Sequence, residues 1–473
     1  MEPMKILVNG QWRQTGVKRQ VFNPFDNKAV GEVFQATSRD IDEAISGADE
    51  AFHQTRRSAP HERHAVLIAV SRALASQKDD FAGLITAETG KPITLARGEV
   101  DRGVFTMATS AEEALRIEGN VLPLDVTPQS ANRTAIVRRF PLGVIGAITP
   151  FNYPLNLVAH KLGPAIAAGN SVVLKPSSNA PQTALKFAEL FVQAGLPSGA
   201  LNVVPCMGSE IEQLITDKRV KLISFTGSPA VGWGLKARSG RKRVLLELGG
   251  NAGVIVCADA QLDHALKSIV QGAFANAGQS CISVQRVYVH ESIAEYFTAQ
   301  LVKLAKSITT GDPTNPRTVV GPMIDEQAAR KVESWIQEAA LQGARVLCGG
   351  TRKGALLEPT VLADVAPEMK VSCQEAFAPV VTVDRFSDFK DAIERVNTSS
   401  YGLQAGIFTN NASDIYNAYR ELEVGGVIVN DASSFRVDHM PYGGTKESGL
   451  GREGVRYAIE EMSELKLLSL NFS

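Results

Sequence analysis

The sequence has few cysteines, and none of them are paired in a recognisable motif. Its 473 residues contain five, Cys206, Cys257, Cys281, Cys348 and Cys373, without a Cys-x-x-Cys pair. An odd and scattered set argues against a disulfide framework or a zinc site, and it is typical of a reducing compartment. We therefore expect no metal and no structural disulfide.

Long apolar runs and an excess of charge are also missing. No apolar stretch approaches 18 residues, and the N-terminal residues lack a basic region followed by an apolar one. Lys and Arg number 49 against 50 Asp and Glu, and the sequence pI is near 6.7. These features predict a cytoplasmic protein that binds neither nucleic acid nor a membrane. The length suggests two or three domains.

The middle of the chain alternates between strand and helix patterns. From residue 143, apolar strands are predicted at 144–149, 171–175, 201–204 and 222–225, with helices between them. A second such series begins near residue 254. Continuous apolar strands separated by helices indicate parallel sheets covered on both faces. The expected fold is therefore α/β, with ligands at the carboxyl ends of the strands.

Segments outside this alternation have other patterns. An Asn-Gly turn at Asn9 predicts a hairpin near the N-terminus, and the apolar spacing in residues 38–119 predicts a helical layer. Strand-like runs at 134–140 and 465–470 lie far apart in the sequence. They are predicted to pair with each other, to extend a sheet across a subunit interface, or simply to end the fold.

Cys281 is a candidate nucleophile. It ends the run Gly278-Gln-Ser-Cys281, between a helix-like segment and a predicted strand that begins at Val284. A thiol at such a turn can serve as a nucleophile if it is deprotonated. A buried structural cysteine is the alternative.

Glu247 and Asn152 are candidates for the remaining chemistry. Glu247 lies in an apolar strand just before Gly249-Gly250, where burial would raise its pKa and make it a competent general base. A satisfied ion pair or cap is the alternative. The Asn152 amide, in Pro150-Phe-Asn152-Tyr-Pro154, is free to donate to a developing oxyanion.

Several turns after predicted strands are candidates for binding a nucleotide. Phe225-Thr-Gly-Ser228 precedes a helix, so its backbone N–H groups and Ser228 suit a phosphate, although Gly-x-Gly-x-x-Gly is absent. Lys175 and Glu375 are candidates for ribose hydroxyls, and Phe377 for a flat ring. Each of these also fits an ordinary surface or loop residue.

Together these motifs resemble the aldehyde dehydrogenase family along essentially the whole chain. The resemblance rests on Thr149-Pro-Phe-Asn152, Lys175-Pro-Ser177, Phe225-Thr-Gly-Ser228, Leu246-Glu-Leu-Gly-Gly250, Gly278-Gln-Ser-Cys281 and Gln374-Glu-Ala-Phe-Ala-Pro379. It is strongest for the branch that acts on lactaldehyde, glyceraldehyde 3-phosphate without phosphorylation, or phosphonoacetaldehyde. It implies oxidation of an aldehyde to a carboxylate with NAD or NADP, and a homodimer or homotetramer.

The family implies two doubly wound parallel-sheet domains and a small β oligomerisation hairpin. The expected cofactor domain is 1–119 with 142–249, the catalytic domain is 250–446, and the oligomerisation and C-terminal segment is 120–141 with 447–473. Cys281 would form a thiohemiacetal and then a thioester, Asn152 and the Cys281 N–H would hold the oxyanion, and Glu247 would activate water. The expected cofactor contacts are Thr149, Pro150, Phe151, Lys175, Ser177, Ser178, Gly208, Phe225, Gly227, Ser228, Gly249, Glu375 and Phe377.

Two departures from the family pattern concern specificity. Members that prefer NAD often carry glutamate where this chain has Ser178, so NADP is expected to be accepted and even preferred. Relatives that take apolar aldehydes often carry tryptophan where this chain has His160. Arg102 occupies the position of a substrate-binding arginine in relatives that act on anionic aldehydes, although an ion pair with Glu99 or Asp101 would also explain it.

A short polar or anionic aldehyde is therefore the expected substrate. Its expected contacts are Arg102, Tyr153, His160, Ser280 and Arg436. Two other classes remain as alternatives: a non-catalytic dinucleotide-binding or structural relative, which the presence of Cys281 and Glu247 disfavours, and a thiol hydrolase with a histidine base. The seven histidines include none in a recognisable nucleophile motif.

Overall fold

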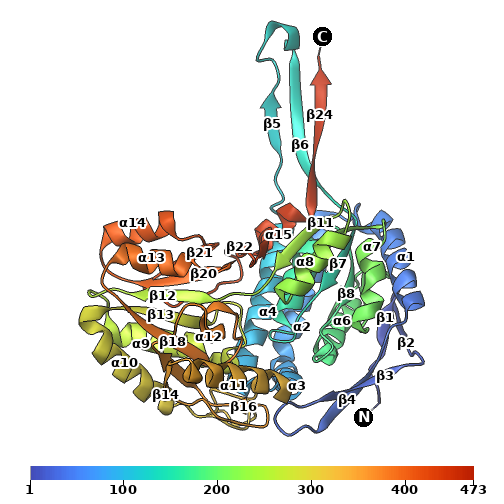
Figure 1. Ribbon diagram of the computed structural model, residues 1–473. Coiled ribbons are helices and arrows are strands. Elements are labelled where there is room, and N and C mark those ends of the chain that lie inside the picture. The colour runs from blue at the N-terminus through green and yellow to red at the C-terminus, as the bar shows by residue number, and fades with distance from the viewer. Residues whose placement is uncertain (1, 473) are drawn as a thin grey trace.

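The computed structural model describes residues 2–472 as two layered α/β bodies and a projecting arm. Figure 1 shows one body built on strands β7 to β11 and the other on β12 to β21, with β5, β6 and β24 extending away from both. The expectation of two doubly wound sheets with a small additional β unit is confirmed.

The first body contains an eight-stranded sheet whose central strands are parallel. The strand order reverses at β7, which has β8 on one side and β10 on the other. Such a switch point opens a crevice at the carboxyl ends of the strands, where ligands bind. In order across the sheet the strands are β2 (Gln11–Arg13), β1 (Ile6–Val8), β9 (Leu201–Val203), β8 (Ser171–Lys175), β7 (Val144–Ile148), β10 (Val220–Thr226), β11 (Arg243–Glu247) and β23 (Gly449–Leu450).

Helices cover both faces of this sheet. Helix α1 begins after Thr37, whose side chain accepts from the Asp40 N–H, and it buries Ala44, Ile45 and Ala48 as its apolar spacing predicts. The predicted hairpin at Asn9 is confirmed, because β1 and β2 pair across it. The helices are α1 (Ser38–Thr55), α2 (Pro60–Ser76), α3 (Lys78–Thr89), α4 (Ile93–Ala114), α5 (Asn156–Ala168), α6 (Pro181–Gln193), α7 (Glu212–Thr216) and α8 (Pro229–Arg238).

The second body contains a seven-stranded sheet that follows the first with little intervening chain. Strand β11 ends at Glu247 and β12 begins at Ala252, so the carboxyl end of one sheet leads directly into the amino end of the next. Across this sheet the strands are β14 (Arg345–Cys348), β17 (Thr360–Ala363), β18 (Val380–Phe386), β13 (Val284–His290), β12 (Ala252–Val256), β20 (Gln404–Phe408) and β21 (Gly426–Val429).

The second body also contains helices between its strands. They are α9 (Leu262–Phe274), α10 (Glu291–Lys306), α11 (Glu326–Leu341), α12 (Lys370–Cys373), α13 (Phe389–Asn397) and α14 (Ala412–Glu421). The hydrophobic core beneath them includes Phe274, Phe297 and Phe408, each at most 1% exposed.

The arm joins segments that are distant in sequence. Strand β24 (Ser463–Asn471) pairs antiparallel with β6 (Arg133–Pro141) along its whole length, and β6 pairs with β5 (Asn120–Pro123). Of the alternatives for these segments, pairing with each other is therefore what the fold adopts. Helix α15 (Val455–Glu461) leads into β24 at the base of the arm (Figure 1). Between residues 2 and 472, no helix is both long and apolar enough to cross a membrane.

Candidate active site

A cavity of about 720 Å³ lies where the two sheets meet. It is lined by strand ends from the first body and by the segment that precedes β13 in the second body. Its walls include these residues expected from sequence: Arg102, Pro150, Phe151, Asn152, Tyr153, Gly227, Ser228, Glu247, Ser280, Cys281, Glu375, Phe377 and Arg436. The other expected residues, Thr149, His160, Lys175, Ser177, Ser178, Gly208, Phe225 and Gly249, lie outside the walls.

Cys281 is presented by an unusual turn. Helix α9 ends at Phe274, and Asn276, Ala277 and Gly278 follow with positive φ angles of 53°, 54° and 66°. A Cβ at Gly278 would lie 2.0 Å from the carbonyl oxygen of Ala378, so only glycine fits there. This turn places the half-buried Cys281 at the cavity wall instead of within the core.

The Cys281 thiol is protonated in the resting site. Burial raises its pKa to about 11, although a hydrogen bond to Tyr442 and the charge of Arg436 oppose that rise. The Sγ atom lies 2.9 Å from the Tyr442 hydroxyl oxygen. A base must therefore remove this proton before the sulfur can attack a carbonyl.

Asn152 lies close to the nucleophile. Its side-chain amide Nδ2 donates to the carbonyl oxygen of Gln279, two residues before Cys281, at 3.1 Å. Its Oδ1 is buried and has no hydrogen-bond partner in the described chain. A donor held here can meet the oxygen of an aldehyde attacked by Cys281.

Glu247 ends β11 with an unsatisfied carboxylate. It is 4% exposed, and within residues 2–472 its Oε2 has no hydrogen-bond partner. Burial, together with the nearby negative charge of Glu453, raises the pKa of Glu247 well above its usual value. The expected general base is therefore present in a buried position facing the cavity.

Glu453 has the opposite protonation behaviour. Burial opposes ionisation, but Lys161, His160 and Arg436 together hold its pKa at about 2. Its carboxylate lies 3.3 Å from Lys161 Nζ and 3.1 Å from Arg436 Nη2. The site therefore contains one permanently ionised glutamate beside one that can exchange a proton.

Arg102 is held by a partner that the sequence did not indicate. Its Nε and Nη2 donate to Asp438 at 3.0 and 2.6 Å, whereas Glu99 pairs with Lys91 and Asp101 pairs with Lys78. The alternative that Arg102 serves as an ion-pair partner of Glu99 or Asp101 is thus wrong. Its guanidinium remains at the cavity wall.

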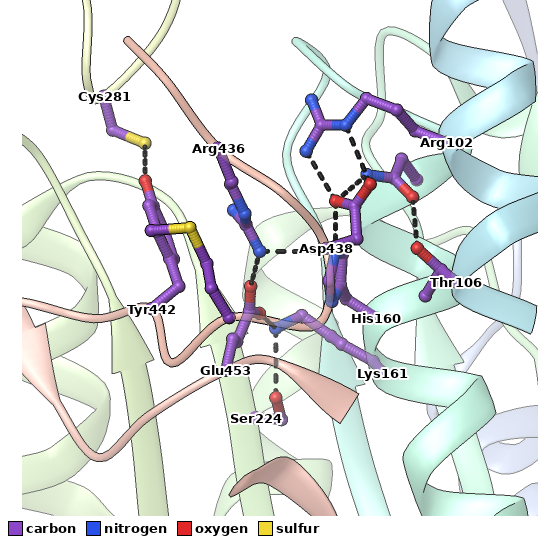
Figure 2. Close-up of polar contacts among 12 residues, drawn as sticks. Arg102, Thr106, His160, Lys161, Ser224, Cys281, Arg436, Asp438, Tyr442 and Glu453 are labelled. Carbon is purple, nitrogen blue, oxygen red and sulfur yellow. Dashed lines mark hydrogen bonds and ion pairs between the residues drawn. The ribbon is translucent and has the colours of Figure 1, made fainter. Parts of the chain in front are cut away.

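His160 lies behind the cavity wall. It is 1% exposed, and its Nε2 lies 2.9 Å from Asp438 Oδ1 (Figure 2). Burial and the charge of Arg436 lower the pKa of His160, while its hydrogen bond with Asp438 opposes that fall. His160 therefore orients Asp438, which in turn holds Arg102.

Four members of this network escaped prediction: Lys161, Asp438, Tyr442 and Glu453. Lys161 carried a usable signal, since a lysine in helix α5, where every residue is buried and most are apolar, needs a buried partner. The other three lie in the irregular segment between β21 and α15, where neither spacing nor burial pattern identifies them. Figure 2 shows these three side chains gathered near Lys161, which comes from a distant part of the sequence.

The opposite end of the site has the shape of a nucleotide cradle. Ser228 stands at the N-cap of α8 with no side-chain cap bond, so its hydroxyl and the helix N-terminus are available to a phosphate. A Cβ at Gly249 would lie 2.6 Å from Glu375 Oε2, and Glu375 Oε1 accepts the Gly250 N–H at 2.8 Å. The close approach of the Gly249–Gly250 backbone to the Glu375 carboxylate suits the binding of a ribose.

Lys175 and Ser178 lie together at the end of β8, with Nζ and Oγ 3.4 Å apart. Thr149 follows β7 and Thr226 ends the neighbouring β10, and both have buried hydroxyls that lack a partner in the described part of the chain. The ring of Phe377 meets that of Phe151 edge-on, with centroids 6.0 Å apart. These residues fit a nicotinamide dinucleotide. No cluster of three metal-ligating side chains occurs between residues 2 and 472.

Comparison with known proteins matches this architecture. Residues 12–468 fit the model of the aldehyde dehydrogenase family. The chain is 47% identical to 3-sulfolactaldehyde dehydrogenase from Priestia aryabhattai, with 98% of each chain covered. It superposes on aldehyde dehydrogenase 21 of Physcomitrella patens, solved with its product succinate, with a TM-score of 0.98, 42% identity and coverage of 100% and 99%.

An NADP-dependent glyceraldehyde-3-phosphate dehydrogenase from Bacillus halodurans C-125, solved with NADP, is also similar. Its TM-score is 0.97 at 36% identity, and all of both chains is covered. The chain belongs to the aldehyde dehydrogenase family. It is an oxidoreductase that uses NAD or NADP to oxidise an aldehyde.

Proposed function

We propose that this enzyme oxidises a short aldehyde carrying a negatively charged or strongly polar group to its carboxylic acid. The observation that carries the proposal is the presence of Arg102 and Arg436 in the wall of the cavity that also contains Cys281, Asn152 and Glu247. Two similar proteins are named for, or were solved with, anionic compounds, a sulfolactaldehyde and succinate.

The proposed reaction begins at Cys281. The Cys281 thiol first loses its proton to solvent through water, and the thiolate attacks the aldehyde carbon. The Asn152 amide, with the Cys281 N–H, stabilises the resulting oxyanion. A nicotinamide held beside Phe151 and Phe377 would supply the oxidising capacity, as the acceptor of a hydride from that carbon.

A thioester on Cys281 is then hydrolysed. Glu247 removes a proton from water, the hydroxide adds to the thioester carbon, and the carboxylic acid leaves as the Cys281 thiol is restored. The unsatisfied Oε2 of Glu247 supports this role, because a buried carboxylate oxygen without a donor can accept from water.

The arginines hold the far end of the substrate. Asp438 accepts hydrogen bonds from Nε and Nη2 of Arg102, so Nη1 is left without a hydrogen-bond partner among residues 2–472. A carboxylate, sulfonate or phosphate of a three- or four-carbon aldehyde can accept from it. The guanidinium lies over the ring of Tyr153, with the Arg102 Cζ 5.3 Å from the ring centroid.

The preference between NAD and NADP is proposed to depend on Ser178. A serine leaves room for a 2′-phosphate, and Lys175 provides a positive charge 3.4 Å away. The remaining expected contacts, Ser177, Gly208 and Phe225, are proposed to complete the nucleotide site. The enzyme is therefore proposed to accept NADP and to prefer it.

The division of labour among segments is likewise proposed. Residues 1–119 with 142–249 bind the cofactor, residues 250–446 carry the nucleophile, and residues 120–141 with 447–473 assemble a homodimer or homotetramer. Exposed apolar side chains on the arm support this, including Val121 at 72%, Leu465 at 58% and Leu467 at 54%. The five free thiols suit the cytoplasm.

A thiol hydrolase with a histidine base finds no support in the geometry. The partner of Cys281 Sγ is Tyr442, and His160 is occupied by Asp438. The decisive experiment measures absorbance of reduced nicotinamide with a panel of short anionic, hydroxylated and apolar aldehydes, with each cofactor. Turnover of the anionic members that is lost in Cys281→Ala supports the proposal, and no turnover with any aldehyde despite cofactor binding contradicts it.

A further inference from the structure

Tyr442 is a buried phenol whose hydroxyl is directed at the nucleophile. It is 3% exposed, and it packs with Cys281, Ile282 and Leu403 in a small cluster. Its backbone is fixed by two hydrogen bonds with Glu453, from the N–H of each residue to the carbonyl oxygen of the other. The ring therefore has a defined position beside the reacting sulfur.

The direction of the hydrogen bond depends on the protonation state of Cys281. Either atom can donate while the thiol is protonated, and the separation is 2.9 Å. A thiolate has no proton, so the phenol must then be the donor. Burial keeps the phenol protonated by raising the pKa of Tyr442 well above its usual value.

Arg436 strengthens this arrangement. Its guanidinium carbon lies 3.6 Å from the centroid of the Tyr442 ring, and Glu453 holds its Nη2 at 3.1 Å (Figure 2). A cation over the ring face withdraws electron density and makes the hydroxyl a better donor. Arg436 thus acts on the sulfur through the ring as well as through its own charge.

We infer that Tyr442 is a functional hydrogen-bond donor to the Cys281 thiolate, supported by Arg436 stacked on its ring. It increases the fraction of reactive thiolate and fixes the direction of Sγ before attack. A purely structural role predicts that phenylalanine would serve equally, since it fills the same volume without the hydroxyl. The inference rests on Cys281 being the nucleophile of the proposed reaction.

The test measures alkylation of Cys281 by iodoacetamide as a function of pH, with the modified peptide quantified by mass spectrometry. Wild type is compared with Tyr442→Phe and with Tyr419→Phe, a matched change at a side chain that is 72% exposed on α14. Loss of a hydrogen bond to a charged group should raise the thiol pKa by about one to two units. At a fixed pH near 8, Tyr442→Phe should therefore react about ten- to hundredfold more slowly, and Tyr419→Phe should react as wild type does.

A second substitution keeps the test informative even if Tyr442→Phe misfolds. Replacement of Tyr442 by a ring-fluorinated tyrosine keeps its shape, makes the phenol more acidic, and should speed alkylation at the same pH. Identical pH profiles for wild type and Tyr442→Phe would overturn the inference, as would slower alkylation of the fluorinated protein. Because alkylation needs no aldehyde, the outcome is separate from that of the turnover assay.

Steady-state kinetics add a readout that a packing role would not produce. Tyr442→Phe should lower kcat at neutral pH, with recovery as the pH rises, and it should leave the KM for NADP unchanged. An altered KM for NADP with an unchanged pH dependence would contradict a role at the sulfur.

Discussion

Asp438 holds the guanidinium of Arg102 through two hydrogen bonds, of 3.0 Å from Nε and 2.6 Å from Nη2. The carboxylate also accepts from Asn156 at 3.0 Å and from His160 at 2.9 Å. Burial opposes ionisation of Asp438, but His160 and Arg102 keep its pKa well below the usual value, so it stays ionised and Arg102 stays oriented. The cavity thereby offers a directed donor whose charge is largely balanced.

Replacement of Arg102 by alanine should weaken the binding of charged aldehydes in particular. Loss of a charge-assisted hydrogen bond predicts about a ten- to hundredfold higher KM for an anionic aldehyde, with little change for a neutral one of equal length. Arg97→Ala, at an exposed arginine of the same helix that pairs with Asp79, is the matched control. Equal losses for charged and neutral aldehydes would contradict a role as anion anchor.

Ser178→Glu should convert the cofactor preference from NADP toward NAD. The new carboxylate would repel a 2′-phosphate and accept from a ribose hydroxyl, so the ratio of kcat/KM for NADP over NAD should fall about tenfold or more. Ser178→Ala, which adds no charge, should change the ratio far less. Preference for NAD in wild type would already refute this assignment.

Glu247→Gln should block release of the acid. Without a base to activate water, hydrolysis of the thioester should slow about a hundredfold or more, while the first turnover still reduces the cofactor. Stopped-flow absorbance should therefore show a burst of reduced nicotinamide followed by slow turnover. Intact-mass measurement should detect the acyl group on Cys281, and its absence would argue against this role for Glu247.

The same substitution should stabilise the fold at alkaline pH. The pKa of Glu247 is raised in the folded state, so the folded protein favours the protonated carboxyl and stability is lost as pH rises toward that pKa. Glutamine cannot ionise, so the Tm of Glu247→Gln should exceed that of wild type at pH 8 and approach it near pH 4. Glu295→Gln, at an exposed position on α10, should show no such dependence.

Charge on the arm should separate the subunits. Leu465→Glu with Leu467→Glu places two carboxylates among the exposed apolar side chains of β24, and it should convert the proposed oligomer to a smaller species in sedimentation velocity. Leu341→Glu, at a leucine that is 90% exposed on α11, is the control for added surface charge. An unchanged sedimentation coefficient in the arm variant would place the interface elsewhere.

The parts of the molecule that the sequence predicted well depend on local pattern. Apolar runs and turns identified the strands ending at Lys175, Thr226 and Glu247, because burial on both faces imposes that composition. The motif residues Cys281 and Asn152 were likewise apparent. Their convergence in one cavity follows from the junction between β11 and β12, which joins the two sheets end to end.

The charged network was beyond the reach of pattern. Asp438 lies 336 residues from Arg102 in sequence, and Glu453 lies 292 residues from Lys161. Neither carboxylate has a neighbouring motif. Each is buried beside a cation that is distant in sequence and compensates its charge. For Arg102 the nearest acidic residues in the sequence were the wrong partners, since helix spacing says nothing about a loop that arrives from the far end of the chain.

The pairing of β24 with β6 has a consequence for biosynthesis. Residues 133–141 leave the ribosome early, yet their partner residues 463–471 emerge only after both sheets have been translated. Until then the backbone N–H and C=O groups along that edge of β6 lack their strand partner, and such an edge is a surface on which a nascent chain can aggregate or recruit a chaperone. If the arm is the assembly surface, assembly through it must wait until residues 463–471 have been made and paired with β6.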